Sequence, residues 1–316
     1  MWANLIRMVS LVTLLLASMA PAVLAQSREA VAVLTELKFN RGDIQIKAVG
    51  KKAPEKPAPL QSLYPGTQIV VTKDAVAVIL FTDGMKTVTI DERNSPFDVK
   101  PPAAKEGSSG AGMKQVASLL FGKKKPPTYI ALAVRGGKHP PTLISPRETK
   151  TMTDAPTFRW MGMEMQTGTL RVYGPEGQVW AAENIARTQL QYPATAPRLK
   201  PGVEYSWSIE KKGFAAEKAR FTVLSPAEAK PVQEQVKSLE GNAGLSKTTL
   251  AILKASLLIS HGLFHEAREV LAAAETADPD EPALHLLLGE TYEKTGLKSL
   301  ALEEYGEAQF LSRISQ

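Results

Sequence analysis

The sequence predicts a multidomain β plus α chain, in which two all-β domains precede a C-terminal domain of α-helical hairpins. Residues 30–137 alternate apolar and polar side chains with the period of two typical of half-buried strands. Residues 140–225 carry seven short apolar and aromatic segments at strand spacing. Near the C-terminus, the segment Gly262–Ala267 recurs as Gly296–Ala301, an offset of 34 residues that is typical of helical-hairpin repeats. A length of 316 residues is enough for two or three domains.

The first 25 residues have the layout of a secretory signal peptide. Arg7 precedes an apolar run from Met8 to Leu16, and Val23-Leu24-Ala25 is a small-residue cleavage pattern. The run is too short to cross a hydrocarbon layer of about 30 Å. We therefore expect residues 1–25 to be cleaved and the protein to be periplasmic, with secretion as the alternative.

Composition and charge limit the chemistry and the kinds of partner that are expected for this chain. The chain has no cysteine, which excludes disulfides, thiol catalysis and lipid anchoring through cysteine. Residues 26–150 carry a net charge of +9, whereas residues 226–316 carry −6, which suggests separate modules with different partners. For an exported protein we expect no nucleic-acid partner. An anionic envelope polymer is a candidate partner for the basic N-terminal half, although a solvated basic surface is the simpler interpretation.

The first β domain is expected over residues 26–138. Its candidate strands lie around Ile44–Ile46, Ile69–Val71, Ala75–Leu80 and Val88–Ile90. The dipeptide Asp83-Gly84 between two of them predicts a hairpin.

Residues 99–127 interrupt this β pattern as a flexible excursion, rich in proline and glycine. Within it, Met113–Phe121 can form a short helix with Val116, Leu119 and Leu120 on one face. The glycines before it are spaced as in a phosphate loop, but methionine stands at position 113, where that loop needs lysine. We therefore expect no nucleotide binding here.

The turn residues of this domain resemble the FecR-like periplasmic domain over about a third of the chain. The matching segments are Gly42-Asp43-Ile44-Gln45, Leu63 with Gly66-Thr67, Thr72-Lys73-Asp74-Ala75, Leu80 with Asp83-Gly84, and Ala133-Val134-Arg135-Gly136. A threonine that usually follows the last segment is Gly137 in this chain. The resemblance implies an all-β periplasmic fold, and it makes signalling together with a membrane receptor an alternative function.

The second β domain is expected over residues 139–225. Its seven strand candidates are the number found in an immunoglobulin-type sandwich; they are Leu143-Ile144, Phe158–Trp160, Leu170–Tyr173, Val179-Trp180, Leu190–Tyr192, Tyr205–Ile209 and Phe221–Leu224. The segment Leu199–Tyr205 resembles the tyrosine corner of fibronectin type III domains. Trp160 and Trp207 lie inside alternating strands and are predicted to be core residues rather than a sugar-stacking platform, a choice left open for Trp180.

The helical domain is expected over residues 226–316. Periodicity predicts four helices near 248–260, 264–277, 282–294 and 298–313, with a further helix near 227–240 docked on the first hairpin. The hairpins resemble tetratricopeptide repeats through small and aromatic residues at matching positions: Leu258, Ala267, Leu271, Ala274 and Pro279 in the first, and Leu288-Gly289, Tyr292, Ala301, Tyr305 and Ala308 in the second.

The repeat resemblance implies that another protein binds along the first helix of each hairpin. Mapped onto this chain, the partner-binding face contains Thr249, Ile252, Ser256, Ile259, Ala283, Leu286, Glu290, Glu293 and Lys294. Glu290 and Glu293 are the expected polar contacts. Leu302 and Phe310 fall outside the apolar stripe of the last helix and Ile314 lies at its margin, which predicts a homo-oligomer or partner contact there.

No pattern points to catalysis. His261 and His265 are four residues apart, but Gly262 places them on either side of a turn, so we expect no metal pair and a surface position for His265. The acidic segment Asp278–Pro282 is expected to cap the next helix rather than bind calcium. We expect no catalytic, cofactor-binding or metal-binding residues. The sequence therefore favours a non-enzymatic exported envelope protein that acts as a protein–protein interaction scaffold.

Overall fold

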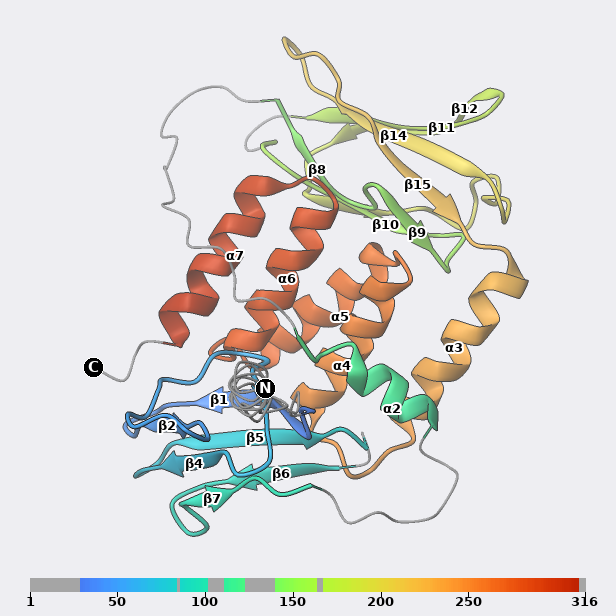
Figure 1. Cartoon of the computed structure of the whole chain (residues 1–316). Helices are drawn as coiled ribbons and strands as arrows, with labels where there is room; N and C mark the ends of the chain where they lie inside the picture. The colour runs from blue at the N-terminus through green and yellow to red at the C-terminus, as the bar shows by residue number, and fades with distance from the viewer. Residues whose placement is uncertain (1–28, 84–85, 102–110, 123–139, 164–166, 313–316) are drawn as a thin grey trace, which may run out of the picture.

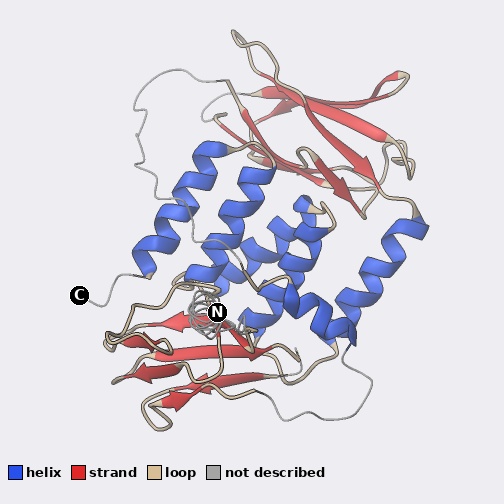
Figure 2. Cartoon of the chain, in the orientation of Figure 1, coloured by secondary structure: helices blue, strands red, loops and turns tan. Residues whose placement is uncertain are grey.

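The computed structural model describes residues 29–83, 86–101, 111–122, 140–163 and 167–312. It confirms a multidomain β plus α fold (Figure 1, Figure 2). The spatial order of the parts differs from their order in the sequence. Strands β1–β7 lie at the bottom of Figure 1 and strands β8–β15 at the top, while the C-terminal helices α3–α7 lie between them. The last part of the chain therefore joins the two β parts. No helix in the described ranges has the length and apolar character needed to cross a membrane.

The first β part contains two antiparallel sheets, with strand orders β3-β1-β5-β6 and β2-β4-β7. The strands are β1 (Ala32–Lys38), β2 (Ile44–Lys47), β3 (Ser62–Leu63), β4 (Gln68–Val71), β5 (Val76–Phe81), β6 (Thr87–Ile90) and β7 (Phe97–Asp98). Apolar side chains from both sheets pack into one core that includes Leu34, Ile44, Ile69 and Ile79. The antiparallel pairing of β5 with β6 confirms the predicted hairpin, although residues 84–85 of its turn lie outside the described residues.

Strand β1 was not predicted, and its burial explains why. Its first six residues are buried, so it lacks the simple alternation that marks a half-exposed strand. Leu34 and Leu37 face the core of the β part, whereas Val33 belongs to the core of the helices. A register shift between Leu34 and Glu36 in its pairing with β5 further disturbs the pattern.

The predicted short helix is confirmed as α2 (Ala111–Ser118), which packs on α3 and α4. Val116, Ala117 and Leu120 are buried there. The lysines at 123–125 and the resemblance segment at 133–136 lie outside the described residues, as do residues 1–25, expected to be a signal peptide, and Ile314.

The second β part also contains two sheets, with strand orders β13-β10-β8 and β12-β11-β14-β15-β9. The strands are β8 (Thr142–Ser145), β9 (Thr149–Thr151), β10 (Thr157–Met161), β11 (Gly168–Gly174), β12 (Gly177–Ile185), β13 (Gln189–Gln191), β14 (Glu204–Glu210) and β15 (Ala219–Val223). Trp160 and Trp207 are buried in its core, as predicted, and Trp180 is half-buried. The predicted tyrosine corner is present, since the Tyr205 hydroxyl accepts a 2.7 Å hydrogen bond from the Lys200 backbone N–H.

Strand β9 is the one strand of this part that lacked a sequence signal. It reads Thr-Lys-Thr and pairs parallel with the end of β15. A short polar segment at a sheet edge carries no apolar pattern, and its position depends on the helix α5 beside it.

The five C-terminal helices are α3 (Pro226–Glu240), α4 (Lys247–Ser260), α5 (Phe264–Ala277), α6 (Pro282–Lys294) and α7 (Lys298–Leu311). They form a packed row in which α7 lies at one end (Figure 1). Ser225 begins α3 with a reciprocal capping box to Glu228. As predicted, α3 docks on α4. Gly262 and Gly296 have positive φ angles of 72° and 80° at the two hairpin turns, where a side chain would be strained.

Two mid-helix glycines give a matched test of the repeat packing. A Cβ atom on Gly289 would lie 2.5 Å from the ring of the buried Tyr305, whereas one on Gly306 would have no neighbour within 4 Å. Gly289→Ala should therefore lower the free energy of unfolding by about 1–2 kcal/mol through overpacking. Gly306→Ala should raise it by up to about 1 kcal/mol, because alanine favours a helix. Urea unfolding of both variants checks this, and equal effects would contradict the crossing of α6 and α7.

Candidate interaction site

The predicted partner-binding face starts on α4, where it is covered by strand β1 of the same chain. Thr249 is fully buried, and its hydroxyl lies 2.7 Å from the Glu36 carboxylate and 2.9 Å from the Thr35 hydroxyl. Ser246, the residue that caps α4, also donates to Glu36. The polar side chains of Thr35 and Glu36 on β1 thus find their partners at the start of α4.

A buried carboxylate makes the second contact between β1 and the helices. Glu281 is the N-cap of α6, as the acidic segment predicted, and its Oε1 accepts from the Ala283 N–H at 3.1 Å. Its Oε2 accepts from the Leu37 N–H at 2.9 Å and lies 3.6 Å from the Lys38 ammonium, which also pairs with Asp278. Glu281 therefore accepts hydrogen bonds from a backbone N–H of strand β1 and from a backbone N–H at the start of α6 at the same time.

Glu281 predicts a pH dependence of stability. Burial raises the pKa of its carboxyl from 4.5 to about 8, although Lys38 and the two N–H groups act in the opposite direction. The folded state binds this proton more tightly than the unfolded state does. Its contribution is therefore complete below pH 4.5 and is lost as the pH rises through about 8. Urea unfolding between about pH 5 and pH 9 should show a decline on the order of 2–4 kcal/mol. Glu281→Gln should reduce the decline, and an unchanged slope in that variant would contradict this origin.

The other predicted partner-binding residues divide into two groups. The first group is buried inside the helical core: Ile252, Ser256 and Ile259 on α4, and Ala283 and Leu286 on α6. Those at the C-terminal end of α6 reach the surface, with Glu290 half-buried and Glu293 and Lys294 exposed. The Tyr305 hydroxyl donates to Glu293 at 2.8 Å and holds this end of α6 against α7. In this conformation, only the last group is open to a separate protein.

The opposite side of the helices binds the second β part. The Lys150 N–H donates to the Gly262 carbonyl at 2.9 Å. Glu266 accepts from the Thr151 hydroxyl at 2.7 Å and from the Met152 N–H at 2.6 Å. Arg159 and Glu269 form a two-pronged ion pair with both distances at 2.9 Å. The N-terminal half of α5 thereby fixes β9 and β10.

His265 lies inside this contact, so the predicted surface position was wrong. It is 5% exposed, and its Nδ1 lies 2.7 Å from the Ser145 hydroxyl. Burial lowers the pKa of His265. The prediction failed because the β part that covers the helix lies about 120 residues earlier in the chain, at a distance that helical periodicity cannot detect.

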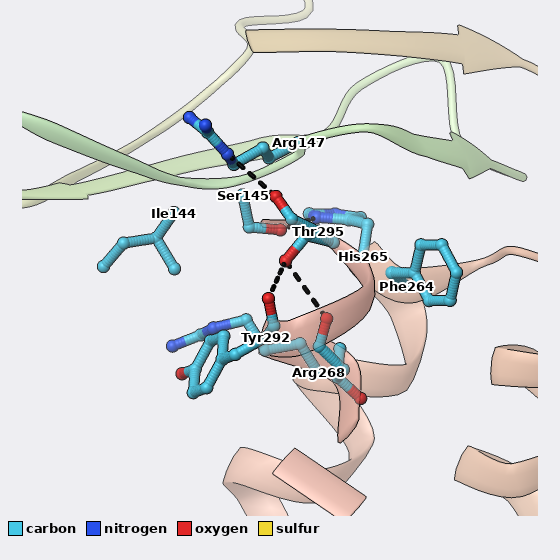
Figure 3. Close-up of a pocket in the computed structure, with 9 residues that line it drawn as sticks. Ile144, Ser145, Arg147, Phe264, His265, Arg268, Tyr292 and Thr295 are labelled. Atoms are coloured by element: carbon cyan, nitrogen blue, oxygen red, sulfur yellow. Dashed lines mark hydrogen bonds between the residues drawn. The ribbon is translucent and has the colours of Figure 1, made fainter. Parts of the chain in front are cut away.

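A small cavity lies where α5 and α6 meet strand β8 and the segment after it (Figure 3). Ser145, Arg147, His265 and Arg268 are among its lining residues, and Arg147 donates to the Thr295 carbonyl at 3.0 Å. Its volume of about 10 Å³ matches a single water molecule, far below the roughly 300 Å³ of a ligand pocket. A serine–histidine pair can support nucleophilic catalysis, but this one is buried beside a space too small for an organic substrate. The cavity is therefore a small gap in the packed contact between the second β part and helices α5 and α6.

Comparison with protein-family models matches none of them, and comparison with curated proteins gives no significant match.

Proposed function

We propose that this chain is a non-enzymatic exported envelope protein whose helical repeats bind another protein. The proposal rests on one observation: part of the surface of the helices is covered by the chain's own β parts, and part is open to solvent. The helices contact the chain's own β parts through α4, α5, the start of α6 and the carbonyl of Thr295 at the end of α6. The turn end of the α6–α7 hairpin presents Glu293 and Lys294 to solvent, and at the other end of the hairpin Phe310 on α7 is 60% exposed. Aromatic residues are enriched in protein-binding surfaces, and Phe310 is a large exposed one.

We also propose a family for each part. A Cβ atom on Gly42 would lie 1.9 Å from the Thr72 carbonyl oxygen, so the glycine of the FecR-like motif has a steric reason to be there. The tyrosine corner supports an immunoglobulin or fibronectin-like sandwich for the second β part. The packing of Gly289 against Tyr305, together with buried Ala301 and Ala308, supports tetratricopeptide-like hairpins.

The proposed location is the periplasm. Its support is the composition of residues 1–25, which lie outside the described residues, together with the resemblance of the first β part to a periplasmic domain.

The test of this function is a double charge reversal in the full chain, Glu290→Lys with Glu293→Lys, followed by crosslinking in cells and mass spectrometry. We expect the variant to lose a protein that the natural chain captures. Glu176→Lys with Glu183→Lys is the matched control, because both acids are exposed and lie on the second β part, in the β11–β12 turn and on β12. An identical set of captured proteins for both variants would contradict the proposal. Because Glu293 also accepts a hydrogen bond from Tyr305, urea unfolding of the variant, followed by circular dichroism, separates loss of binding from loss of folding.

A further inference from the structure

Three consecutive helices bring two carboxylates and an imidazole together at the α5–α6 turn. Glu275 lies near the end of α5, His285 in the first turns of α6 and Glu304 on α7. One ligand atom from each of the three lies within 4.8 Å of the other two. His285 is 5% exposed and Glu275 and Glu304 are half-buried, so the group is enclosed but reachable from solvent.

The orientation of His285 is fixed from outside the group. Its Nε2 donates to the backbone carbonyl of Pro279 at 2.8 Å, while its Nδ1 faces the Glu304 carboxylate at 2.8 Å. A histidine that binds a metal through one nitrogen usually donates its other N–H to a carbonyl or a carboxylate in this way. The bond to Pro279 thus leaves Nδ1 directed at Glu304, and a carboxylate oxygen of Glu275 completes the group.

The two carboxylates need positive charge between them. Burial, followed by the charge of Glu304, raises the pKa of Glu275, and His285 and Arg268 are the cations that oppose this rise. Burial alone lowers the pKa of His285. The hydrogen bonds to Glu304 and Pro279 and the negative charges of both glutamates outweigh burial, so the pKa of His285 is raised to about 9. A divalent cation placed among the three ligand atoms would neutralise both carboxylates.

The donor set is one imidazole nitrogen and two carboxylates, a combination that suits zinc. Zinc binds nitrogen and oxygen ligands at about 2.0–2.2 Å, which places neighbouring ligands of a tetrahedral site about 3.3 Å apart. Ligand atoms within 4.8 Å of one another reach that spacing by small side-chain rotations. Three protein ligands leave a fourth position for water.

We propose that Glu275, His285 and Glu304 bind a zinc ion. On binding, zinc takes the position between Nδ1 and the carboxylates, and the Nδ1 proton leaves to solvent. The ion would join α5, α6 and α7 next to the turn that carries Asp278 and Glu281, the residues that bind β1. Its role would be to stabilise the joint between the repeats and the first β part.

The test is zinc titration of the chelator-treated full chain, read by competition with a chromophoric chelator and by circular dichroism. We expect one zinc per chain. His285→Gln should weaken the zinc affinity at least about 100-fold. Loss of a residue that only hydrogen-bonds to a metal ligand weakens metal affinity about 10- to 100-fold, so a loss of this size indicates a direct ligand. Gln preserves a donor toward Pro279, and Glu275→Gln gives a second variant on another helix.

His261→Gln is the matched control, since His261 is exposed and lies outside the group. It should bind zinc as the natural chain does. Absence of stoichiometric zinc binding would overturn the proposal, and so would equal affinity in the natural chain and in folded His285→Gln and Glu275→Gln.

Discussion

Replacing Glu281 with alanine is expected to lower the free energy of unfolding by about 3 kcal/mol. The side chain is fully buried and accepts hydrogen bonds from the Leu37 and Ala283 N–H groups. Its removal leaves two buried donors without an acceptor, and each such donor costs about 1–3 kcal/mol. Urea unfolding near neutral pH, followed by circular dichroism, measures the loss.

Two neighbouring substitutions control for this effect. Asp280→Ala changes an exposed acid one residue away and should stay within about 0.5 kcal/mol of the natural chain. Glu281→Gln keeps the shape and one acceptor oxygen, so its cost should be intermediate. If Glu281→Ala were no more destabilising than Asp280→Ala, β1 would not depend on this carboxylate.

Replacing Trp207 with alanine is expected to cost about 3–5 kcal/mol, the range for deleting a buried aromatic side chain. Trp207 is fully buried, and its ring centroid lies 5.0 Å from that of Phe158. Its Nε1 donates to the Pro146 carbonyl at 2.6 Å. The next residue, Arg147, donates to the Thr295 carbonyl on the helices. Loss of the ring should therefore weaken both the second β part and its joint with α6.

Two further variants separate the contribution of the buried ring from that of its hydrogen bond. Trp180→Ala removes a half-buried ring at the same sheet pair and should cost less than Trp207→Ala. Trp207→Phe keeps most of the apolar area but loses the hydrogen bond to Pro146, and should lie between the two. Urea unfolding monitored by circular dichroism provides the comparison, and equal losses in the two alanine variants would contradict the proposed core.

The helices were predictable because each hairpin carries its own signals. The observed α5 and α6 match the predicted ranges, and α4 begins one residue earlier. Apolar periodicity, the glycines at the turns and the acids before α6 act within a few residues of one another. The tyrosine corner was predictable for the same reason, since Tyr205 bonds to a backbone group only five residues away.

What the sequence did not reveal is which surfaces of the helices the chain itself covers. The apolar pattern of α4 shows that one face is buried but not that part of its cover is β1. The bond between Leu37 and Glu281 spans 244 residues, and no local pattern encodes it. Glu36 gave a faint signal, as the lone acid of the β1 sequence Ala-Val-Leu-Thr-Glu-Leu-Lys. The predicted partner face was therefore larger than the part that reaches solvent.

This internal contact also determines how the protein should be tested. Val33, Leu60 and Leu80 of the first β part share a core with α4 and α6. A chain that ends near Ser225 would expose that core and the buried polar groups of β1. Point variants in the full chain are therefore the appropriate comparison.

The most direct test of the scaffold account is site-specific photo-crosslinking from position 293 in the full chain in living cells. The same crosslinker at position 176, in the exposed turn between β11 and β12, serves as the reference. We expect position 293 to capture a reproducible protein that position 176 does not, and we expect Glu290→Lys to reduce this capture. Capture of nothing at position 293, or of the same proteins at both positions, would contradict it.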